Sequence, residues 1–92
     1  MVRLEFAPAI QRLGERVPRA PLDVDAATLG MALEAAFAAV PPLRGYLLDD
    51  QGAVRKHVAV FVNGTLLHDR SNLSRPVGAG DRIFVAQALS GG

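Results

Sequence analysis

The chain has 92 residues, half of them hydrophobic, with a formal net charge of +1 and no cysteine. This length corresponds to one domain, which buries roughly 60% of the surface that its unfolded chain exposes. A domain this small has little stability to spare, so a deep enclosed catalytic cavity is not expected. The even mixture of arginines and acids excludes the basic stripe of a nucleic-acid binder, and the lack of cysteine excludes disulfides, thiolate metal sites and a thiol nucleophile.

Residues 2–6 alternate apolar and polar side chains, which predicts a half-buried strand rather than a signal peptide. Pro8 ends that pattern, and residues 10–17 are expected to form a turn. Residues 22–24 predict a second, short strand. Two prolines precede it and cannot donate ladder hydrogen bonds, so this strand is expected at an edge of the sheet.

Residues 29–40 carry apolar side chains at helical spacing and predict the one clear helix of the chain. Asp25 or Thr28 is expected to cap its N-terminus by accepting a free backbone N–H. The two prolines that follow are expected to end the helix, because proline cannot continue its hydrogen bonds. Residues 43–57 are expected to form a connection to the next strand.

Residues 57–62 alternate strongly and predict a strand with its valines on the core face. Asn63 and Gly64 form the strongest short hairpin signal, so residues 65–67 are expected to return as a strand. After a polar stretch, residues 82–88 predict the last strand.

The expected order of elements is strand, strand, helix, strand, strand, strand. This order predicts an α+β fold of the β-grasp (ubiquitin-like) kind, a mixed sheet packed on one main helix. Residues 1–88 are expected to form this domain and residues 89–92 a flexible diglycine tail. No apolar run approaches the ~18 residues of a membrane helix, so we expect a cytoplasmic protein without a membrane partner.

The two glycines Gly91 and Gly92 are the most informative chemical feature of the sequence. Glycine lacks a Cβ, so such a tail is thin enough to enter a narrow channel in another enzyme. A free carboxylate is a poor electrophile, but joining it to AMP creates a good leaving group that a sulfur nucleophile can displace. The alternative is that two terminal glycines are simply a frayed end.

Three segments of the sequence resemble the MoaD/ThiS family of sulfur carriers, namely residues 58–64, 80–85 and 90–92. The helix that ends in prolines and the segment 47–52 resemble the longer members of that family. The resemblance covers nearly the whole chain in order. It departs from the family at Gln87, at or near which many members carry proline.

The resemblance implies a carrier protein that is not itself an enzyme, although the molybdopterin type serves as the small subunit of a synthase. Gly92 would be adenylated and then thiocarboxylated. The residues that the resemblance implies in the activating enzyme's channel are Ala88, Leu89, Ser90 and Gly91. Phe84 and Ala86 are also expected to bind a partner, because they lie on the strand that leads to the tail. No metal or bound cofactor is implied, and ATP would be used by the activating partner.

The implied partners are a ubiquitin-activating-enzyme-like adenylyltransferase, a sulfur donor (a sulfurtransferase or sulfide) and a synthase subunit that accepts the sulfur. The ending 90–92 resembles the molybdopterin type, whereas the long middle segment also resembles carriers that feed cysteine synthesis. Thiamine-type carriers are shorter and lack the 41–57 connection. Two other functions stay open: a ubiquitin-like modifier conjugated through Gly92, and a β-grasp interaction domain.

Several side chains have both a functional and an ordinary interpretation. His57 and His68 with Asp69 could ligate zinc, although solvated histidines are the simpler expectation. Three arginines, at positions 70, 75 and 82, could form a patch for an acidic partner or simply promote solubility. Phe61 and Phe84 alternate out of phase with the core valines, which predicts either an apolar docking patch or a second buried face under residues 41–57.

Overall fold

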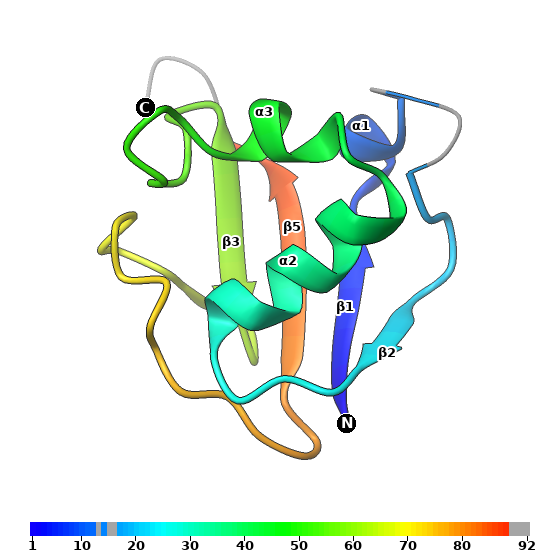
Figure 1. Cartoon of the computed structure of the whole chain (residues 1–92), viewed down its shortest axis with the longest axis vertical. Coiled ribbons are helices and arrows are strands. Elements are labelled where there is room, and N and C mark those ends of the chain that lie inside the picture. The colour runs from blue at the N-terminus through cyan, green and yellow to red at the C-terminus, as the bar shows by residue number, and fades with distance from the viewer. Residues whose placement is uncertain (13, 15–16, 89–92) are drawn as a thin grey trace.

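The computed structural model describes residues 1–12, 14 and 17–88. In chain order its elements are β1 (Val2–Phe6), α1 (Pro8–Gln11), β2 (Leu22–Val24), α2 (Leu29–Ala39), α3 (Leu43–Leu47), β3 (Val58–Val62), β4 (Thr65–Leu66) and β5 (Arg82–Gln87). The strands form one sheet in the order β2-β1-β5-β3-β4 (Figure 1). β1 and β5 run parallel, and the other neighbouring pairs are antiparallel. The predicted mixed sheet is therefore confirmed, with β2 at an edge.

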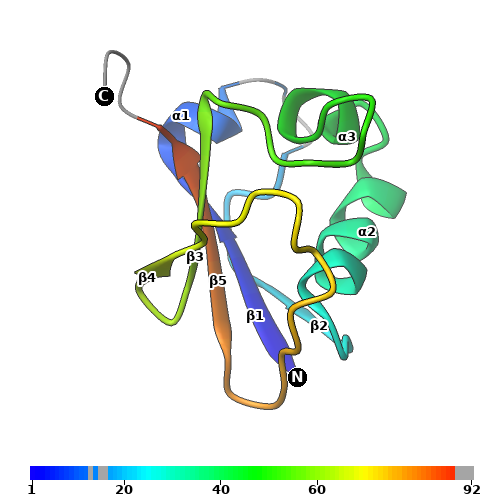
Figure 2. The same cartoon turned by 90° about the vertical axis from the view of Figure 1, so that its left-hand side faces the viewer.

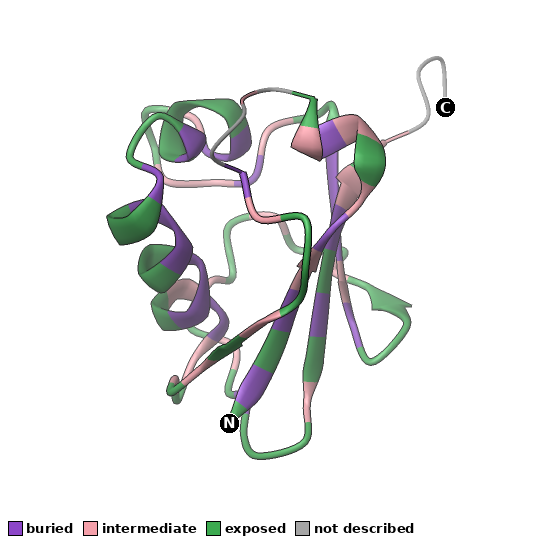
Figure 3. Cartoon of the chain, turned by 90° about the vertical axis from the view of Figure 1, so that its right-hand side faces the viewer, coloured by how far each residue is buried: buried purple, intermediate pink, exposed green. Residues whose placement is uncertain are grey.

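The sheet has one covered face and one open face. Figure 2 shows α2 and α3 packed against one side of the sheet, with the β3–β4 hairpin projecting from the other. Buried residues line the side of α2 that faces the sheet (Figure 3), and they include Leu29, Leu33 and Phe37. Opposite them lie Leu4 and Ile83, both fully buried. Each such side chain contributes about 1.5–3 kcal/mol by leaving water.

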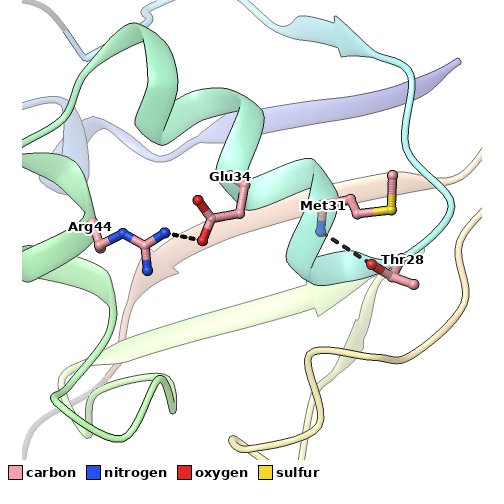
Figure 4. A network of polar contacts seen from close by, with 4 residues as sticks. All are labelled: Thr28, Met31, Glu34 and Arg44. Carbon is pink, nitrogen blue, oxygen red and sulfur yellow. Dashed lines mark hydrogen bonds and ion pairs between the residues drawn. The ribbon is translucent and has the colours of Figure 1, made fainter.

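The N-terminus of α2 is capped by Thr28, one of the two residues expected there. Its Oγ1 accepts a hydrogen bond from the Met31 N–H at 3.2 Å (Figure 4). On the same helix, the Glu34 carboxylate pairs with the Arg44 guanidinium of α3. Both side chains are about half exposed, so the pair contributes no more than about 1 kcal/mol. The same guanidinium lies over the Phe37 ring, 5.1 Å from its centroid, and so also joins the two helices.

Two segments expected to lack regular structure contain short helices, and those expectations were wrong. Residues 43–57 begin with α3, which buries Leu43 and Leu47 against the core. Residues 10–17 overlap α1, which starts with Pro8 in its first turn and buries Ile10. A helix of four or five residues is too short to form without tertiary contacts, so local sequence alone did not predict either one.

The hairpin between β3 and β4 forms as predicted. Asn63 and Gly64 have φ angles of 52° and 82°. A two-residue hairpin turn requires such left-handed conformations so that its backbone twist matches that of the flanking strands. The Asn63 side chain also accepts a hydrogen bond from the Arg82 N–H at 2.9 Å. The turn is thereby fixed to the first residue of β5.

Candidate functional site

The last strand lies at the centre of the sheet and leads toward the expected tail. β5 pairs with β1 on one side and with β3 on the other. Beyond its last residue, the Ala88 N–H donates to the His57 backbone oxygen at 2.8 Å, so the chain is held in place up to Ala88. Leu89, Ser90, Gly91 and Gly92 lie outside the described residues.

The open face of the sheet carries an aromatic pair, of which one ring is exposed and the other is half-buried. Phe61 of β3 and Phe84 of β5 are directly opposite each other, with ring centroids 6.3 Å apart and planes inclined at 44°. Phe84 is 39% exposed and Leu66, which is paired with Phe61, is 38% exposed. Residues 41–57 do not cover this face (Figure 2), so it is not the second buried face that was the alternative for these phenylalanines. We call Phe61, Leu66, Phe84 and the adjacent Ala86 the open-face patch.

A tight turn lies beside Ala88, where the Val58 N–H donates to the Arg55 backbone oxygen at 3.0 Å. The flanking side chains bind the end of α3: Arg55 Nε donates to Gly45 O at 2.9 Å, and His57 Nε2 lies 3.2 Å from Tyr46 O. The Arg55 N–H donates to Leu47 O at 2.9 Å. Carbonyl groups at a helix C-terminus lack intrahelical partners, so this turn completes the hydrogen bonding of α3.

The other polar side chains considered above do not form a catalytic or metal site among the described residues, and two of them stabilise the local backbone. His68 is exposed, and residues 1–12, 14 and 17–88 contain no group of three or more His, Asp or Glu that could hold a metal ion. Asp49 Oδ1 accepts hydrogen bonds from Gln51 N at 2.9 Å and Ala53 N at 3.0 Å, as expected of a turn residue. Arg70 donates to the backbone oxygens of Arg55 and Val58.

The turn that leads into β5 is stabilised by a carboxylate. Asp81 accepts hydrogen bonds from Asn63 Nδ2 at 3.0 Å and from Gly78 N at 2.8 Å. The hydrogen bond from the Asn63 side chain, followed by that from Gly78, lowers the pKa of Asp81 because both stabilise its ionised form. This group orients the start of the strand and stands at the opposite end of β5 from Ala88.

Sequence reasoning missed the turn at residues 55–58 as a neighbour of Ala88. No local signal links position 56 with position 88. Only the antiparallel pairing of β3 with β5, in which Val58 lies opposite Gln87, brings the two together.

Comparison with known proteins identifies the family of this chain. It is 33% identical over 87 residues to small archaeal modifier protein 1 of Haloferax volcanii, covering 95% of this chain and 94% of that protein. No protein-family model matches. None of the helices in the described part of the chain is long and apolar enough to cross a membrane.

Solved structures share the fold over almost the whole chain. The crystal structure of small archaeal modifier protein 1 from Haloferax volcanii has a TM-score of 0.71 and 28% identity, covering 99% of this chain and 98% of that one. A chain of the BexX/CysO complex from Amycolatopsis orientalis has a TM-score of 0.79 at 18% identity, with both chains covered completely. The second match supports the β-grasp fold alone. With the sequence match, these structures show that the chain belongs to the β-grasp family of ubiquitin-like sulfur carriers and modifiers that includes small archaeal modifier protein 1.

Proposed function

We propose that this protein carries sulfur as a thiocarboxylate on Gly92. A carboxylate oxygen of Gly92 attacks the α-phosphate of ATP in a partner enzyme and releases pyrophosphate. A sulfur nucleophile then attacks the acyl-adenylate, and AMP leaves with the electrons of the broken C–O bond. The chain supplies the acyl group and the partner supplies the catalytic groups. This assignment rests on the family of the chain and on the hydrogen bond that holds the backbone just after the end of β5.

The observation that carries the proposal is the hydrogen bond from Ala88 to His57 O at 2.8 Å. It fixes the backbone four residues before Gly92. Four residues reach at most about 14 Å when extended. The nucleotide site of the activating enzyme must therefore come within about this distance of Ala88, and the body of the domain must touch the rim of the partner's channel.

The open-face patch supplies a docking surface for that contact. Phe84 and Ala86 lie on the strand that leads to the tail, and Phe61 and Leu66 extend the apolar area across the sheet. Aromatic side chains that are exposed in the free protein and buried on binding commonly dominate interface energies. We propose that Phe84, Ala86, Ala88, Leu89 and Ser90 contact the partner in sequence from the sheet to the channel.

The proposed partners are an adenylyltransferase of the ubiquitin-activating type, a sulfur donor and a synthase subunit that accepts the sulfur. A chain of similar fold occurs in the BexX/CysO complex, which supports partnership with another protein. Molybdopterin synthesis is the first pathway to test, and synthesis of cysteine or another sulfur metabolite is the second.

Protein modification is the second candidate function, favoured by the name of the 33%-identical relative, a modifier protein. In that case a lysine amine of a target, instead of sulfur, would displace AMP from Gly92. Cells that express an affinity-tagged chain would then contain high-mass conjugates that are lost when Gly92 is deleted.

The experiment for sulfur carriage is an intact-mass measurement. The protein is incubated with the adenylyltransferase of the same organism, ATP and sulfide. We expect a mass gain equal to the replacement of one oxygen by sulfur, with no gain in a variant that lacks Gly92. A variant lacking Gly92 that reacts like wild type would overturn the assignment. If neither protein gives a thiocarboxylate or an acyl-adenylate with any candidate activator, we would conclude that the protein is a β-grasp interaction domain and not a carrier.

A further inference from the structure

The turn between β3 and β4 contains an asparagine that can react with its own backbone. In the pair Asn63 and Gly64, the backbone nitrogen of the glycine can attack the side-chain amide of the asparagine, and no Cβ hinders its approach. Both residues are exposed, so water reaches them. The other asparagine of the chain, Asn72, is followed by Leu73, whose side chain hinders the same attack. Asparagine is among the least durable residues chemically, and this pair is its most reactive setting.

The attacking nitrogen is open to reaction in the folded protein. No residue in the described part of the chain accepts a hydrogen bond from the Gly64 N–H. Gly64 has a φ of 82°, and a Cβ built on it would meet nothing within 4 Å. Side chains of neighbouring elements therefore leave open space at this residue.

The Asn63 side chain, by contrast, is bound to the start of β5. Its Nδ2 donates a hydrogen bond to Asp81 Oδ1 at 3.0 Å, and its Oδ1 accepts one from the Arg82 N–H at 2.9 Å. The nitrogen bound by Asp81 is the leaving group of the reaction, so this hydrogen bond must be lost as the reaction proceeds. A carboxylate that accepts from an amide N–H also increases the electron density of that amide, which makes its carbon a weaker electrophile.

We propose that Asn63 is a site of spontaneous deamidation and that the hydrogen bond to Asp81 sets its rate in the folded protein. The Gly64 nitrogen attacks Asn63 Cγ, an N–Cγ bond forms, and the Cγ–Nδ2 bond breaks. The proton of the Gly64 N–H leaves with Nδ2 as ammonia, and a five-membered succinimide remains. One water then opens the ring at either carbonyl and gives aspartate or isoaspartate. No enzyme or other co-reactant is needed.

The product conflicts with Asp81 in both of its forms. A carboxylate at position 63 cannot donate to Asp81 Oδ1, and two negative charges would face each other where an amide and a carboxylate are now 3.0 Å apart. Isoaspartate also adds a CH2 group to the backbone of the turn, which a two-residue hairpin does not accommodate. The same hairpin pairs Phe61 with Leu66, so deamidation is expected to loosen the open-face patch.

The test follows deamidation of the whole protein over time at neutral pH. Trypsin separates the two asparagines, because residues 57–70 and 71–82 form different peptides. In wild type, the peptide with Asn63 should gain the mass that corresponds to replacing NH2 by OH, as chromatographically distinct aspartate and isoaspartate forms. The peptide with Asn72 should stay unchanged. Equal rates at Asn63 and Asn72 would overturn the assignment of the site.

Variants at Asp81 test the control of the rate. Asp81→Ala removes the acceptor and should deamidate about three- to tenfold faster at Asn63, the factor that one ordinary hydrogen bond supplies. Asp81→Asn keeps an acceptor oxygen and should react more slowly than Asp81→Ala. Equal rates in Asp81→Ala and wild type would overturn the role of Asp81.

A matched control excludes a general effect of lower stability. Thr28→Ala removes the cap of α2 and leaves the contacts of Asn63 in place. Each variant is incubated at a temperature at which circular dichroism shows it to be folded. Thr28→Ala should deamidate at the wild-type rate. Acceleration equal to that of Asp81→Ala would mean that unfolding limits the reaction, and would overturn the proposal.

The conflict in the product can be tested without waiting for the reaction. Asn63→Asp introduces the carboxylate directly, and aspartate tolerates the left-handed backbone of this turn. Its midpoint of thermal unfolding should be lower than that of wild type at neutral pH. The exchange variant Asn63→Asp/Asp81→Asn restores an amide opposite a carboxylate and should recover part of the loss. A midpoint of Asn63→Asp at or above that of wild type, or no recovery on exchange, would overturn the conflict with Asp81.

Discussion

The guanidinium of Arg70 donates a hydrogen bond from Nη1 to the backbone oxygen of Val58 at 2.7 Å, and a further one to Arg55 O. Its own backbone oxygen accepts from the Val54 N–H at 2.9 Å. β4 has only two residues and pairs with the end of β3, so the start of β3 has no strand on that side. Arg70 forms hydrogen bonds at this unpaired edge and so stabilises the turn beside Ala88.

Replacing Arg70 with alanine is expected to destabilise the protein by about 1.5–3 kcal/mol, because charge-assisted hydrogen bonds to backbone carbonyls would be lost. Urea unfolding measures the change. Arg19→Ala is the control, since Arg19 is exposed and its side chain makes no hydrogen bond with a described residue. Equal stability of the two variants would mean that the Arg70 contacts contribute nothing net.

Adjacent residues of β5 are expected to separate stability from partner binding. Phe84 is 39% exposed, whereas Ile83 is fully buried. Ile83→Ala should cost about 2–5 kcal/mol of stability, since it leaves a cavity in the core. Phe84→Ala should cost only about 1 kcal/mol, mostly from the lost contact with Phe61, but should raise the KM for adenylation about tenfold.

The control for that binding effect is Met31→Ala. Met31 is an apolar residue on α2, 52% exposed, on the opposite layer from the open-face patch. Its replacement should leave the KM for adenylation unchanged. A rise in KM as large as that of Phe84→Ala would show that the open face has no special part in docking.

Two helical glycines are expected to respond in opposite directions to alanine. A Cβ on Gly30 would lie 3.0 Å from Leu73 O, the same oxygen that accepts from the Gly30 N–H at 2.7 Å. A Cβ on Gly45 would meet nothing within 4 Å. Gly45→Ala should therefore stabilise the protein by up to about 1 kcal/mol through helix propensity. Gly30→Ala should destabilise it, because the segment that carries Leu73 must move away. Thermal unfolding of both variants checks the sign, and stabilisation by Gly30→Ala would contradict the close approach.

Asp81 is expected to make stability fall in acid. Its hydrogen bonds from Asn63 and Gly78 hold the pKa of the folded-state carboxyl below the ordinary value. The ionised Asp81 therefore contributes its full stabilisation at pH values above the pKa of this carboxyl in the unfolded chain, which is about 4. That stabilisation is lost as the pH falls from there through the lower pKa of the folded state. Asp81→Asn should flatten this part of the curve of melting temperature against pH. An Asp81→Asn curve that falls in acid as steeply as that of wild type would contradict this assignment.

The sequence by itself predicted the elements whose signals are local. Alternation gave β1, β3 and β5, because a strand with one buried face repeats every two residues. The Thr28 cap, the prolines after α2 and the pair Asn63 and Gly64 marked ends and turns through their own backbone preferences. The phase of Phe84 relative to the core valines placed it on the face away from them, but it left open whether that face was exposed or covered. The family resemblance also came from the sequence, in short segments spread in order along the chain.

The tertiary structure decided what depends on contacts between distant segments. α3 has five residues, including Gly45, and persists because Leu43 and Leu47 are buried and because Arg55 and His57 bind its last carbonyl groups. From the sequence, Arg70 could only be interpreted as a surface charge. In the structure β4 is short, and Arg70 forms hydrogen bonds at the edge of β3 that β4 leaves unpaired. His57 and Ala88 are 31 positions apart in the sequence, and the Ala88 N–H donates to the His57 backbone oxygen. They become neighbours only because β3 and β5 pair in antiparallel register, and no local propensity encodes such a pairing.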